Sequence, residues 1–339
     1  MKPVCFNCGR EREALEFRCS HCGGIFHMTP DFPFKESIEE NFPYIRKFLT
    51  LGEVQTPVIR AGTAYLKLDY FQPTFSYKDR GTRTLISYLS QIRKEYGIKT
   101  LTEDSSGNAG ASIAAYGKAA GFGVEVYVPS TTSGHKLAQI KSYGANIHRV
   151  QGSREEVALA AQNGSGFYSS HVYAPEFRDG IRSLAYEIYQ QFGDNIPGRI
   201  YVPTSAGTLL TGLAEGLLHL KHSGRLNRLP RLVIAQPEVI APFCRDLKGI
   251  SREIGQQKSI ADALVTVNSP LKELILKRFG EMLDCRAVSE TEILDAHGEL
   301  ASKGVLAELS SAVAYAAWKQ AGEEVESLII LTGNGLKTL

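Results

Sequence analysis

The sequence predicts a parallel, doubly wound α/β protein, and two observations lead to this prediction. From Lys99 onward, short runs of β-branched residues alternate with amphipathic, alanine-rich stretches. The predicted strands are apolar, which is typical of parallel strands that helices cover on both faces. In chain order the predicted elements are strand 99–103, helix 109–120, strand 124–128, helix 134–143, strand 146–150, helix 154–162, helix 180–191, strand 199–202, helix 208–220, strand 231–236, helices 290–303 and 308–320, and strand 327–331.

Composition excludes several classes of protein. The 339 residues are 43% hydrophobic and 22% charged, so a folded chain of one or two domains is expected. Lys and Arg number 38 against 36 Asp and Glu, which gives no reason to expect nucleic-acid binding. No run approaches the roughly 18 apolar residues of a membrane span, and the start has no apolar signal segment. We expect a soluble, cytoplasmic protein.

Four of the six cysteines lie near the amino terminus, as two C-x2-C pairs that are each followed by glycine. Cys5 and Cys8 form the first pair, and Cys19 and Cys22 follow ten residues later. Two such turns supply four thiolates, the closed donor set of a structural Zn²⁺ site, and the glycine permits a positive φ. Iron is the main alternative metal, while disulfides or unused thiols are the other readings. The module resembles a zinc ribbon, and its closed donor set predicts a structural role.

Lys78 lies where a helix is expected to begin. Ser76 can cap the apolar-periodic segment 84–92, which places Lys78 in the first turn. The positive end of the helix dipole disfavours a cation there, which would lower the pKa of the amine, as a Schiff-base lysine requires. The other reading is an ordinary solvated lysine.

Three glycine-bearing loops follow predicted strands. Residues 105–110 (SSGNAG) and 204–208 (TSAGT) each precede a helix, whose first amide groups favour an anion. The third loop, 332–337 (TGNGLK), follows the last predicted strand. Each loop alone is equally compatible with an ordinary turn.

Taken in order, these segments resemble the threonine synthases, which are fold-type II (tryptophan-synthase β-like) pyridoxal-phosphate enzymes. Residues 73–81 (PTFSYKDRG) are similar to that family's P-T-G-S-F-K-D-R-G motif, and residues 52–57 (GEVQTP) to its G-E-G-x-T-P motif. The loops 105–110 and 332–337 look like its S-x-G-N-x and T-G-x-G-L-K motifs, and residues 134–139 (GHKLAQ) resemble its G-K-x-A-Q helix.

The resemblance implies a role for each matching residue. Lys78 would carry pyridoxal 5'-phosphate as a Schiff base and act as general base. Asn108 would bind the ring hydroxyl of the cofactor, and Thr332 its pyridine nitrogen. The phosphate cradle would consist of Thr204, Ser205, Ala206, Gly207 and Thr208, and the substrate carboxylate would lie at Ser105 and Ser106.

The implied reaction makes threonine and phosphate from O-phosphohomoserine and water. The family usually binds the substrate phosphate with an N-S-x-N-P-Y-R-x-E-G stretch, where this chain has residues 171–180 (HVYAPEFRDG). Val172 and Phe177 replace the expected hydroxyl and guanidinium, and Phe75 replaces the glycine near the lysine. Lys136 and Arg178 are the candidate anion-binding residues.

Other activities on the same scaffold are also compatible with this sequence. The alternative activities are serine or threonine dehydration, or β-replacement that makes cysteine or cysteate. A non-catalytic binding protein is a third reading, against which the intact Lys78 counts. We expect a metal module at 1–27, a large cofactor domain from 28–84 and 166–339, a small domain at 85–165, and a homodimer.

Overall fold

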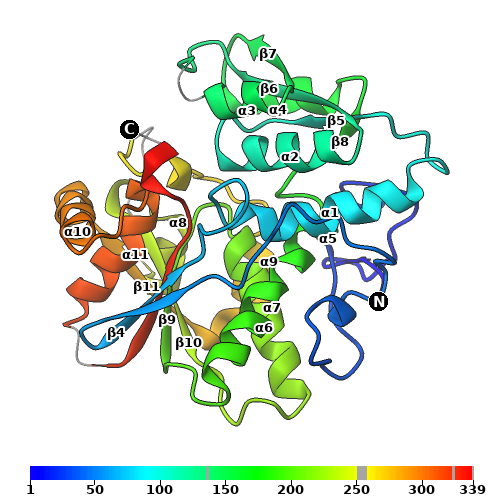
Figure 1. Cartoon of the computed structure of the whole chain (residues 1–339). Coiled ribbons are helices and arrows are strands. Elements are labelled where there is room, and N and C mark those ends of the chain that lie inside the picture. The colour runs from blue at the N-terminus through cyan, green and yellow to red at the C-terminus, as the bar shows by residue number, and fades with distance from the viewer. Residues whose placement is uncertain (135–136, 250–257, 323–324, 338–339) are drawn as a thin grey trace. The chain divides into compact units, whose positions relative to one another are not determined.

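The computed structural model describes residues 1–134, 137–249, 258–322 and 325–337 of the chain (Figure 1). These residues form two compact units. Unit 1 comprises residues 1–53 and 78–181, and unit 2 comprises residues 54–77 and 182–339.

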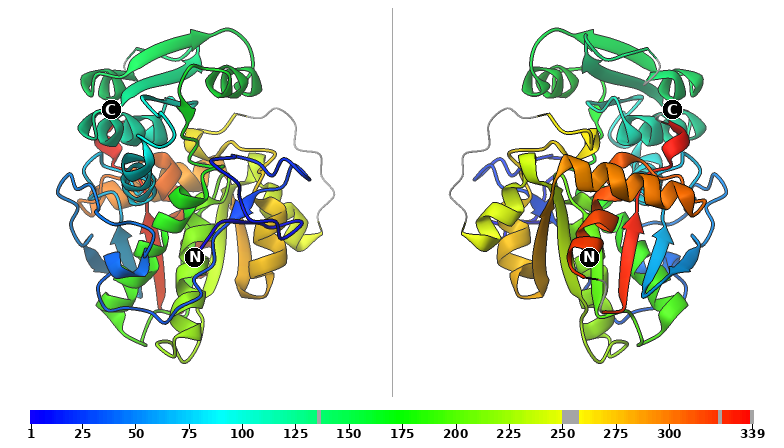
Figure 2. Two further views of the ribbon diagram at one scale, coloured as in Figure 1. Left: turned by 90° about the vertical axis from the view of Figure 1, so that its right-hand side faces the viewer. Right: turned by 90° about the vertical axis from the view of Figure 1, so that its left-hand side faces the viewer.

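Unit 2 is built on a six-stranded sheet with the strand order β11-β10-β9-β12-β4-β3. All neighbouring strands are parallel except β3 and β4, which form an antiparallel pair at one edge. Figure 2 shows β12 in red beside β4 in blue in its right-hand view. The strands are β3 (Val58–Ala61), β4 (Ala64–Leu68), β9 (Arg199–Pro203), β10 (Arg231–Pro237), β11 (Leu283–Val288) and β12 (Ser327–Leu331).

Helices cover both faces of this sheet. Helices α10 and α11 lie on one side, and α6 and α7 lie on the other (Figure 1). The core between α11 and the sheet includes Trp318, Ile329 and Leu331, all fully or nearly fully buried. The helices of unit 2 are α6 (Arg182–Phe192), α7 (Thr208–His222), α8 (Pro242–Lys248), α9 (Lys272–Phe279), α10 (Glu290–Ser302) and α11 (Leu309–Gln320).

Unit 1 contains a four-stranded parallel sheet with the order β7-β6-β5-β8. Its strands are β5 (Thr100–Glu103), β6 (Gly123–Pro129), β7 (Asn146–Val150) and β8 (Phe167–Tyr168). Its helices are α1 (Lys78–Ile92), α2 (Asn108–Ala119), α3 (Ala138–Ser142), α4 (Arg154–Gln162) and α5 (Pro175–Gly180). The cysteine module adds an antiparallel pair, β1 (Val4–Cys5) with β2 (Phe26–His27).

The α/β fold class predicted from the sequence is confirmed, and nearly every predicted element lies within one or two residues of an observed one. The predicted helix 134–143 is described only in part, as α3, because residues 135–136 lie outside the described residues. The sequence did not predict β3, β4, β8, β11, α5, α8 or α9. Strand β3 is partly exposed and β8 has only two residues, so neither carries an apolar pattern long enough to recognise.

Within the part of the chain that the structure describes, no helix combines the length and apolarity needed to cross a bilayer. The domain boundaries expected from the sequence remain a prediction.

Candidate active site

Two of the predicted loops lie at one edge of the sheet in unit 2. Strands β9 and β12 are parallel neighbours. The loops that begin at Thr204 and Thr332 follow the carboxyl ends of these strands. Ligand sites of open α/β sheets lie at this edge, outside the carboxyl ends of the strands. The pairing of β9 with β12 therefore brings the predicted phosphate loop and the predicted pyridine-nitrogen loop to the same edge.

The phosphate loop enters helix α7 through a glycine that no larger residue can replace. Gly207 has φ +92°, and a Cβ atom there would lie 2.2 Å from Ile275 Cδ1. Helix α7 begins at the next residue, Thr208, and runs for 15 residues. The first turn of such a helix presents backbone N–H groups without helical acceptors, together with the positive end of the dipole. The loop thus has the chemistry of a phosphate cradle and fits the phosphate of pyridoxal phosphate.

The other residues of this loop are held by their neighbours. The Thr204 hydroxyl donates to the Val202 carbonyl at 2.9 Å, and the side chain is almost fully buried. The Ser205 hydroxyl lies 2.8 Å from that of Thr266. The Ala206 carbonyl accepts from the Ser269 hydroxyl at 2.6 Å. The loop is therefore pinned at three successive residues, which keeps its backbone amides in place.

The loop after β12 is organised by Ser311 of helix α11. The backbone amides of Thr332 and Gly333 donate to Ser311 Oγ at 3.0 and 2.9 Å. The Thr332 hydroxyl lies 3.0 Å from the same oxygen. A Cβ atom on Gly333 would lie 2.0 Å from Glu308 Oε2, so glycine is required for this close approach. Thr332 is thus fixed at the edge of the sheet, and its role at the pyridine nitrogen remains a prediction.

The segment that leads into Lys78 runs alongside this loop. Ser76 forms an isolated antiparallel bridge with Gly333. The Tyr77 amide donates to the Thr332 carbonyl at 3.0 Å. These contacts fix the two residues that precede Lys78 in the chain. Two motifs that are more than 250 residues apart in sequence are therefore paired through their backbones.

Lys78 is the first residue of helix α1 in unit 1, which confirms its predicted position in the first turn. Its Nζ lies 5.9 Å from the centre of the Phe177 ring, and its side chain is partly buried. The next residue, Asp79, is fully buried and accepts a hydrogen bond from Ser112 Oγ at 2.6 Å. The start of α1 is thereby tied to helix α2.

The loop between β5 and α2 carries three of the predicted residues. Helix α2 begins at Asn108, and Ser105, Ser106 and Asn108 are all partly exposed. Gly110 is required because a Cβ atom there would lie 2.0 Å from the Ser105 carbonyl oxygen. This close approach curls the loop over the helix start. The roles of these residues at the cofactor ring and the substrate carboxylate remain predictions.

Of the two residues predicted to bind the substrate anion, the structure describes only Arg178. Lys136 lies outside the described residues. Arg178 is buried, and its two terminal nitrogens donate to the carbonyls of Val172 and of Phe26 in the cysteine module. These bonds give Arg178 a structural role between α5 and the module, and its contact with substrate stays a prediction.

The four amino-terminal cysteines converge as predicted. Their sulfur atoms all lie within 4.8 Å of one another, with 3.4 Å between Cys5 and Cys22 and 3.7 Å between Cys8 and Cys19. The glycines after the two pairs, Gly9 and Gly23, have φ +74° and +70°. Burial opposes ionisation of Cys19, yet backbone amides of Cys22 and His21 lower its pKa to about 6. A closed set of four thiolates fits structural zinc.

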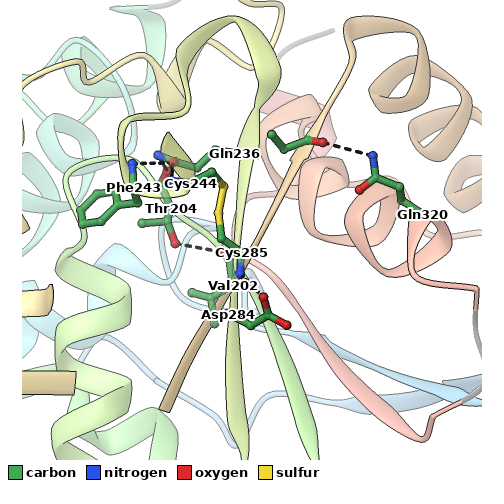
Figure 3. The surroundings of a disulfide bond; sticks show 9 residues. Val202, Thr204, Gln236, Phe243, Cys244, Asp284, Cys285 and Gln320 are labelled. Atoms are coloured by element: carbon green, nitrogen blue, oxygen red, sulfur yellow. Dashed lines mark hydrogen bonds between the residues drawn. A yellow bond between two sulfur atoms is a disulfide. The ribbon is translucent and has the colours of Figure 1, made fainter. Parts of the chain in front are cut away.

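A disulfide lies next to the phosphate loop and was not predicted from the sequence. Cys244 of α8 and Cys285 of β11 are bonded, with their Cα atoms 5.3 Å apart (Figure 3). Gln236 connects this bond to the loop: its Oε1 accepts from the Cys244 amide at 3.3 Å, and its Nε2 donates to the Thr204 carbonyl at 3.1 Å. The two cysteines are 41 positions apart in the sequence, and no local pattern connects them.

Comparison with known proteins agrees with this geometry. The profile of the family described as "Pyridoxal-phosphate dependent enzyme" matches residues 49–333. A threonine synthase of Methanosarcina acetivorans is 24% identical, covering 98% of this chain and 91% of its own length. An L-serine dehydratase/L-threonine deaminase of Bos taurus is 33% identical, but covers 51% of each chain.

The structure of maize serine racemase superposes with a TM-score of 0.71 at 21% identity, covering 83% of this chain and 88% of that one. This similarity supports the fold. Because the family profile spans most of the chain, the protein belongs to the pyridoxal-phosphate-dependent enzymes.

Proposed function

We propose that this pyridoxal-phosphate-dependent enzyme is a lyase of the threonine synthase type, which converts O-phosphohomoserine and water into threonine and phosphate. The observation that carries the proposal is the backbone pairing of Ser76 and Tyr77 with Gly333 and Thr332. It joins the segment leading to the candidate lysine with the candidate pyridine-nitrogen residue. The similarity to a threonine synthase along 98% of the chain supports the same reading.

The loops after β9 and β12 carry residues that would hold the cofactor. The amides at the start of α7, with Thr204, Ser205, Ala206, Gly207 and Thr208, would bind its phosphate. The Thr332 hydroxyl would bind the ring nitrogen, and because a hydroxyl is neutral it would leave that nitrogen unprotonated. Bound pyridoxal phosphate supplies an acceptor for the electron pair left at Cα of the substrate. A neutral ring is a weaker acceptor, which suits elimination and replacement better than transamination.

The residues of unit 1 would act on the substrate. Ser105 and Ser106 would bind its carboxylate, and Asn108 the ring hydroxyl of the cofactor. Lys78, as a free amine, would remove the proton from Cα and return protons at later steps. Lys136 and Arg178 stay candidates for the substrate phosphate. We also propose that Cys5, Cys8, Cys19 and Cys22 hold one structural zinc ion, that the enzyme is a homodimer, and that the domains follow the boundaries 1–27, 28–84 with 166–339, and 85–165.

The second candidate function is dehydration of serine or threonine. The 33% identity to the bovine dehydratase over half of the chain favours it. Dehydration needs the same lysine and cofactor residues but no site for a substrate phosphate. β-Replacement that makes cysteine or cysteate needs the same residues and is the third alternative.

The experiment offers the purified enzyme O-phosphohomoserine, O-phosphoserine, O-acetylserine, serine and threonine in turn, and identifies the products. Threonine and phosphate from O-phosphohomoserine are the expected result. Turnover of serine or threonine without turnover of O-phosphohomoserine would reject the threonine synthase assignment in favour of the dehydratase.

Lys78→Ala tests the cofactor attachment. The visible absorbance of lysine-bound cofactor and the adduct fixed by borohydride should both be lost. Lys277→Ala is the matched control, because Lys277 is exposed and pairs only with Glu273 on its own helix among the described contacts. A borohydride-fixed adduct that persists in Lys78→Ala would refute the assignment of Lys78.

A further inference from the structure

A buried glutamate and a histidine form a pair beside Lys78 that the proposed reaction has not used. Strands β5 and β8 are parallel neighbours with Thr102 opposite Tyr168. Glu103 ends β5, and His171 follows β8 by three residues. The sheet therefore brings both side chains to the same edge, where His171 Nδ1 lies 2.8 Å from Glu103 Oε1.

The environment of Glu103 favours a carboxyl group that keeps its proton. The side chain is fully buried. Its second oxygen, Oε2, has no hydrogen-bond partner among the described residues. A carboxylate in such a place loses its hydration without replacement, which is costly, whereas a neutral acid tolerates it. Burial raises the pKa of Glu103 to about 8, against the opposing effects of the positive charge of Lys78, a hydrogen bond from the His171 backbone and the positive charge of Arg154.

The histidine is also favoured as a neutral group. Burial, and then the positive charge of Lys78, lowers the pKa of His171 well below its usual value, while Asp104 opposes this shift and Arg154 adds to it. Two neutral groups in contact hold one proton between Oε1 and Nδ1. The pair is therefore uncharged as long as that proton remains.

Lys78 is placed to respond to the charge of this pair. Both Lys78 and His171 lie against the Phe177 ring, whose centre is 5.9 Å from Lys78 Nζ and 6.0 Å from the centre of the His171 ring. Phe177 is fully buried, and a Cβ atom on Gly81 of α1 would lie 2.6 Å from it, so α1 and the ring are tightly packed. An apolar ring excludes water from this region and leaves the electrostatic interaction little screened.

Asp104, the acid next to Glu103 in the chain, has a hydrogen-bond partner of its own. Asp104 accepts a hydrogen bond from the Tyr168 hydroxyl at 3.0 Å. Burial, followed by the charge of Glu103, raises the pKa of Asp104. Asp104 therefore also resists ionisation, and Glu103 is the acid on which the charge of Lys78 acts most directly.

We propose that Glu103 and His171 are positioning residues for Lys78, and that the proton they share decides whether a neutral pair or an anion faces its amine. With the proton on Glu103 Oε1, the carboxyl group donates to Nδ1, and His171 carries its own proton on Nε2. When the pair ionises, the Oε1 proton moves to Nδ1 and the Nε2 proton leaves to water. One proton is released, and a carboxylate then accepts from Nδ1–H.

This arrangement matters for the chemistry because Lys78 must alternate between amine and ammonium. The neutral pair adds no negative charge near the amine and so favours the free base that removes a proton. The ionised pair stabilises the ammonium that returns one. The inference rests on the proposed role of Lys78, but its test needs neither cofactor nor substrate.

The test measures the pKa of Lys78 in full-length protein stripped of cofactor. Competitive acetylation with acetic anhydride, followed by mass spectrometry of the Lys78 peptide, gives the pH midpoint of the free amine. Glu103→Gln cannot become an anion, so the midpoint should fall by about one pH unit relative to wild type. His171→Leu removes the Nδ1–H donor to the carboxylate and should shift the midpoint in the same direction.

The combination of the two variants distinguishes a shared proton from two separate effects. The double variant should show no further shift than Glu103→Gln alone, because both substitutions remove the same anion. The chain offers a matched control in a less buried pair of the same residue types: Glu125→Gln, whose partner His148 lies 3.7 Å away, should leave Lys78 unchanged.

Circular dichroism checks that the variants are folded. If Glu103→Gln does not fold, His171→Leu carries the same expected shift. An unchanged midpoint in the folded variants, or shifts that add in the double variant, would overturn the proposal. Because acetylation involves no turnover, such a result leaves the proposed reaction untouched, while failure of the substrate experiment leaves the Glu103–His171 result standing.

Discussion

Arg12 and Glu176 form an ion pair that is almost completely buried, and it fastens the cysteine module to helix α5. Only 5% and 4% of the two side chains are exposed. Arg18 adds a hydrogen bond to the Tyr173 hydroxyl at 2.6 Å, and its guanidinium lies 4.7 Å from the centre of that ring. The module is therefore anchored on the stretch 171–180, which includes His171.

Removing one partner of this pair should be strongly destabilising. Arg12→Met leaves the Glu176 carboxylate buried without its counter-ion, which lowers the free energy of unfolding by about 3–5 kcal/mol. Lys2→Met is the matched control, because both residues of the Lys2–Glu11 pair are exposed and such a pair contributes little to stability. Denaturant unfolding measures both. Equal effects of the two substitutions would contradict a special role for the buried pair.

Metal content should depend on the amino-terminal cysteines alone. Elemental analysis is expected to find about one zinc per chain, and Cys5→Ser should lose it because a structural site needs all four thiolates. Cys285→Ser should retain the metal, since Cys285 belongs to the disulfide. Unchanged zinc in Cys5→Ser would rule out the site, and iron in place of zinc would identify the alternative metal.

Phe75→Gly should stabilise the protein. Phe75 has φ +62°, a left-handed conformation that is costly for a side chain with a Cβ atom, and half of it is exposed. Its backbone is held there because its amide donates to Gln72 and its carbonyl accepts from Asn334. Glycine relieves this strain by about 1 kcal/mol.

Phe71→Gly is the control for Phe75→Gly. Phe71 is similarly exposed but has no positive φ, so glycine there should destabilise through added backbone freedom and lost stacking on Tyr70. Thermal or denaturant unfolding gives the sign of each change. Destabilisation by both substitutions would mean that the Phe75 side chain contributes more than its strain costs.

Reduction of the disulfide should lower stability and loosen the phosphate loop. A cross-link over 41 residues contributes up to about 4 kcal/mol in the chain-entropy treatment. Cys244→Ser and Cys285→Ser should each match the reduced wild type and be insensitive to dithiothreitol. Cofactor affinity should fall as well, because Gln236 connects Cys244 to Thr204. A wild-type stability that dithiothreitol does not change would contradict this prediction.

The pH dependence of stability should change in Glu103→Gln. Burial raises the pKa of Glu103 from 4.5 to about 8, so the folded chain holds a proton that the unfolded chain has released. The stabilisation that protonated Glu103 contributes is complete below the pKa that Glu103 has in the unfolded chain. It is lost as the pH rises through the pKa that Glu103 has in the folded chain. Glutamine does not titrate. The free energy of unfolding of the variant should therefore rise relative to that of wild type as the pH increases from about 6.5 to about 8.

The comparison isolates Glu103 because His171, whose pKa is lowered by burial, is neutral in the folded chain across this window, and its protonation in the unfolded chain is the same in both proteins. Denaturant unfolding of both proteins at the two ends of the window measures the change. Parallel pH profiles for wild type and variant would contradict the raised pKa.

Sequence patterns were enough to predict the alternating elements, because apolar runs and helix starts are local properties of the chain. The C-x2-C-G spacing was enough to predict the cysteine cluster, since two tight turns bring their thiols together wherever they lie. The order of the loops around Lys78, Asn108, Thr204 and Thr332 predicted the family that the comparisons then showed.

Only the tertiary structure decided which distant residues meet. Cys244 and Cys285 become partners because α8 packs beside β11. Arg178 donates a hydrogen bond to the carbonyl of Phe26, so the position of its side chain depends on where the cysteine module packs. Glu103 and His171 meet because β5 and β8 are neighbours in a sheet whose order no local pattern specifies. The sequence thus determined the kind of groups this protein carries, whereas strand order and packing determined which of those groups share a proton, a charge or a bond.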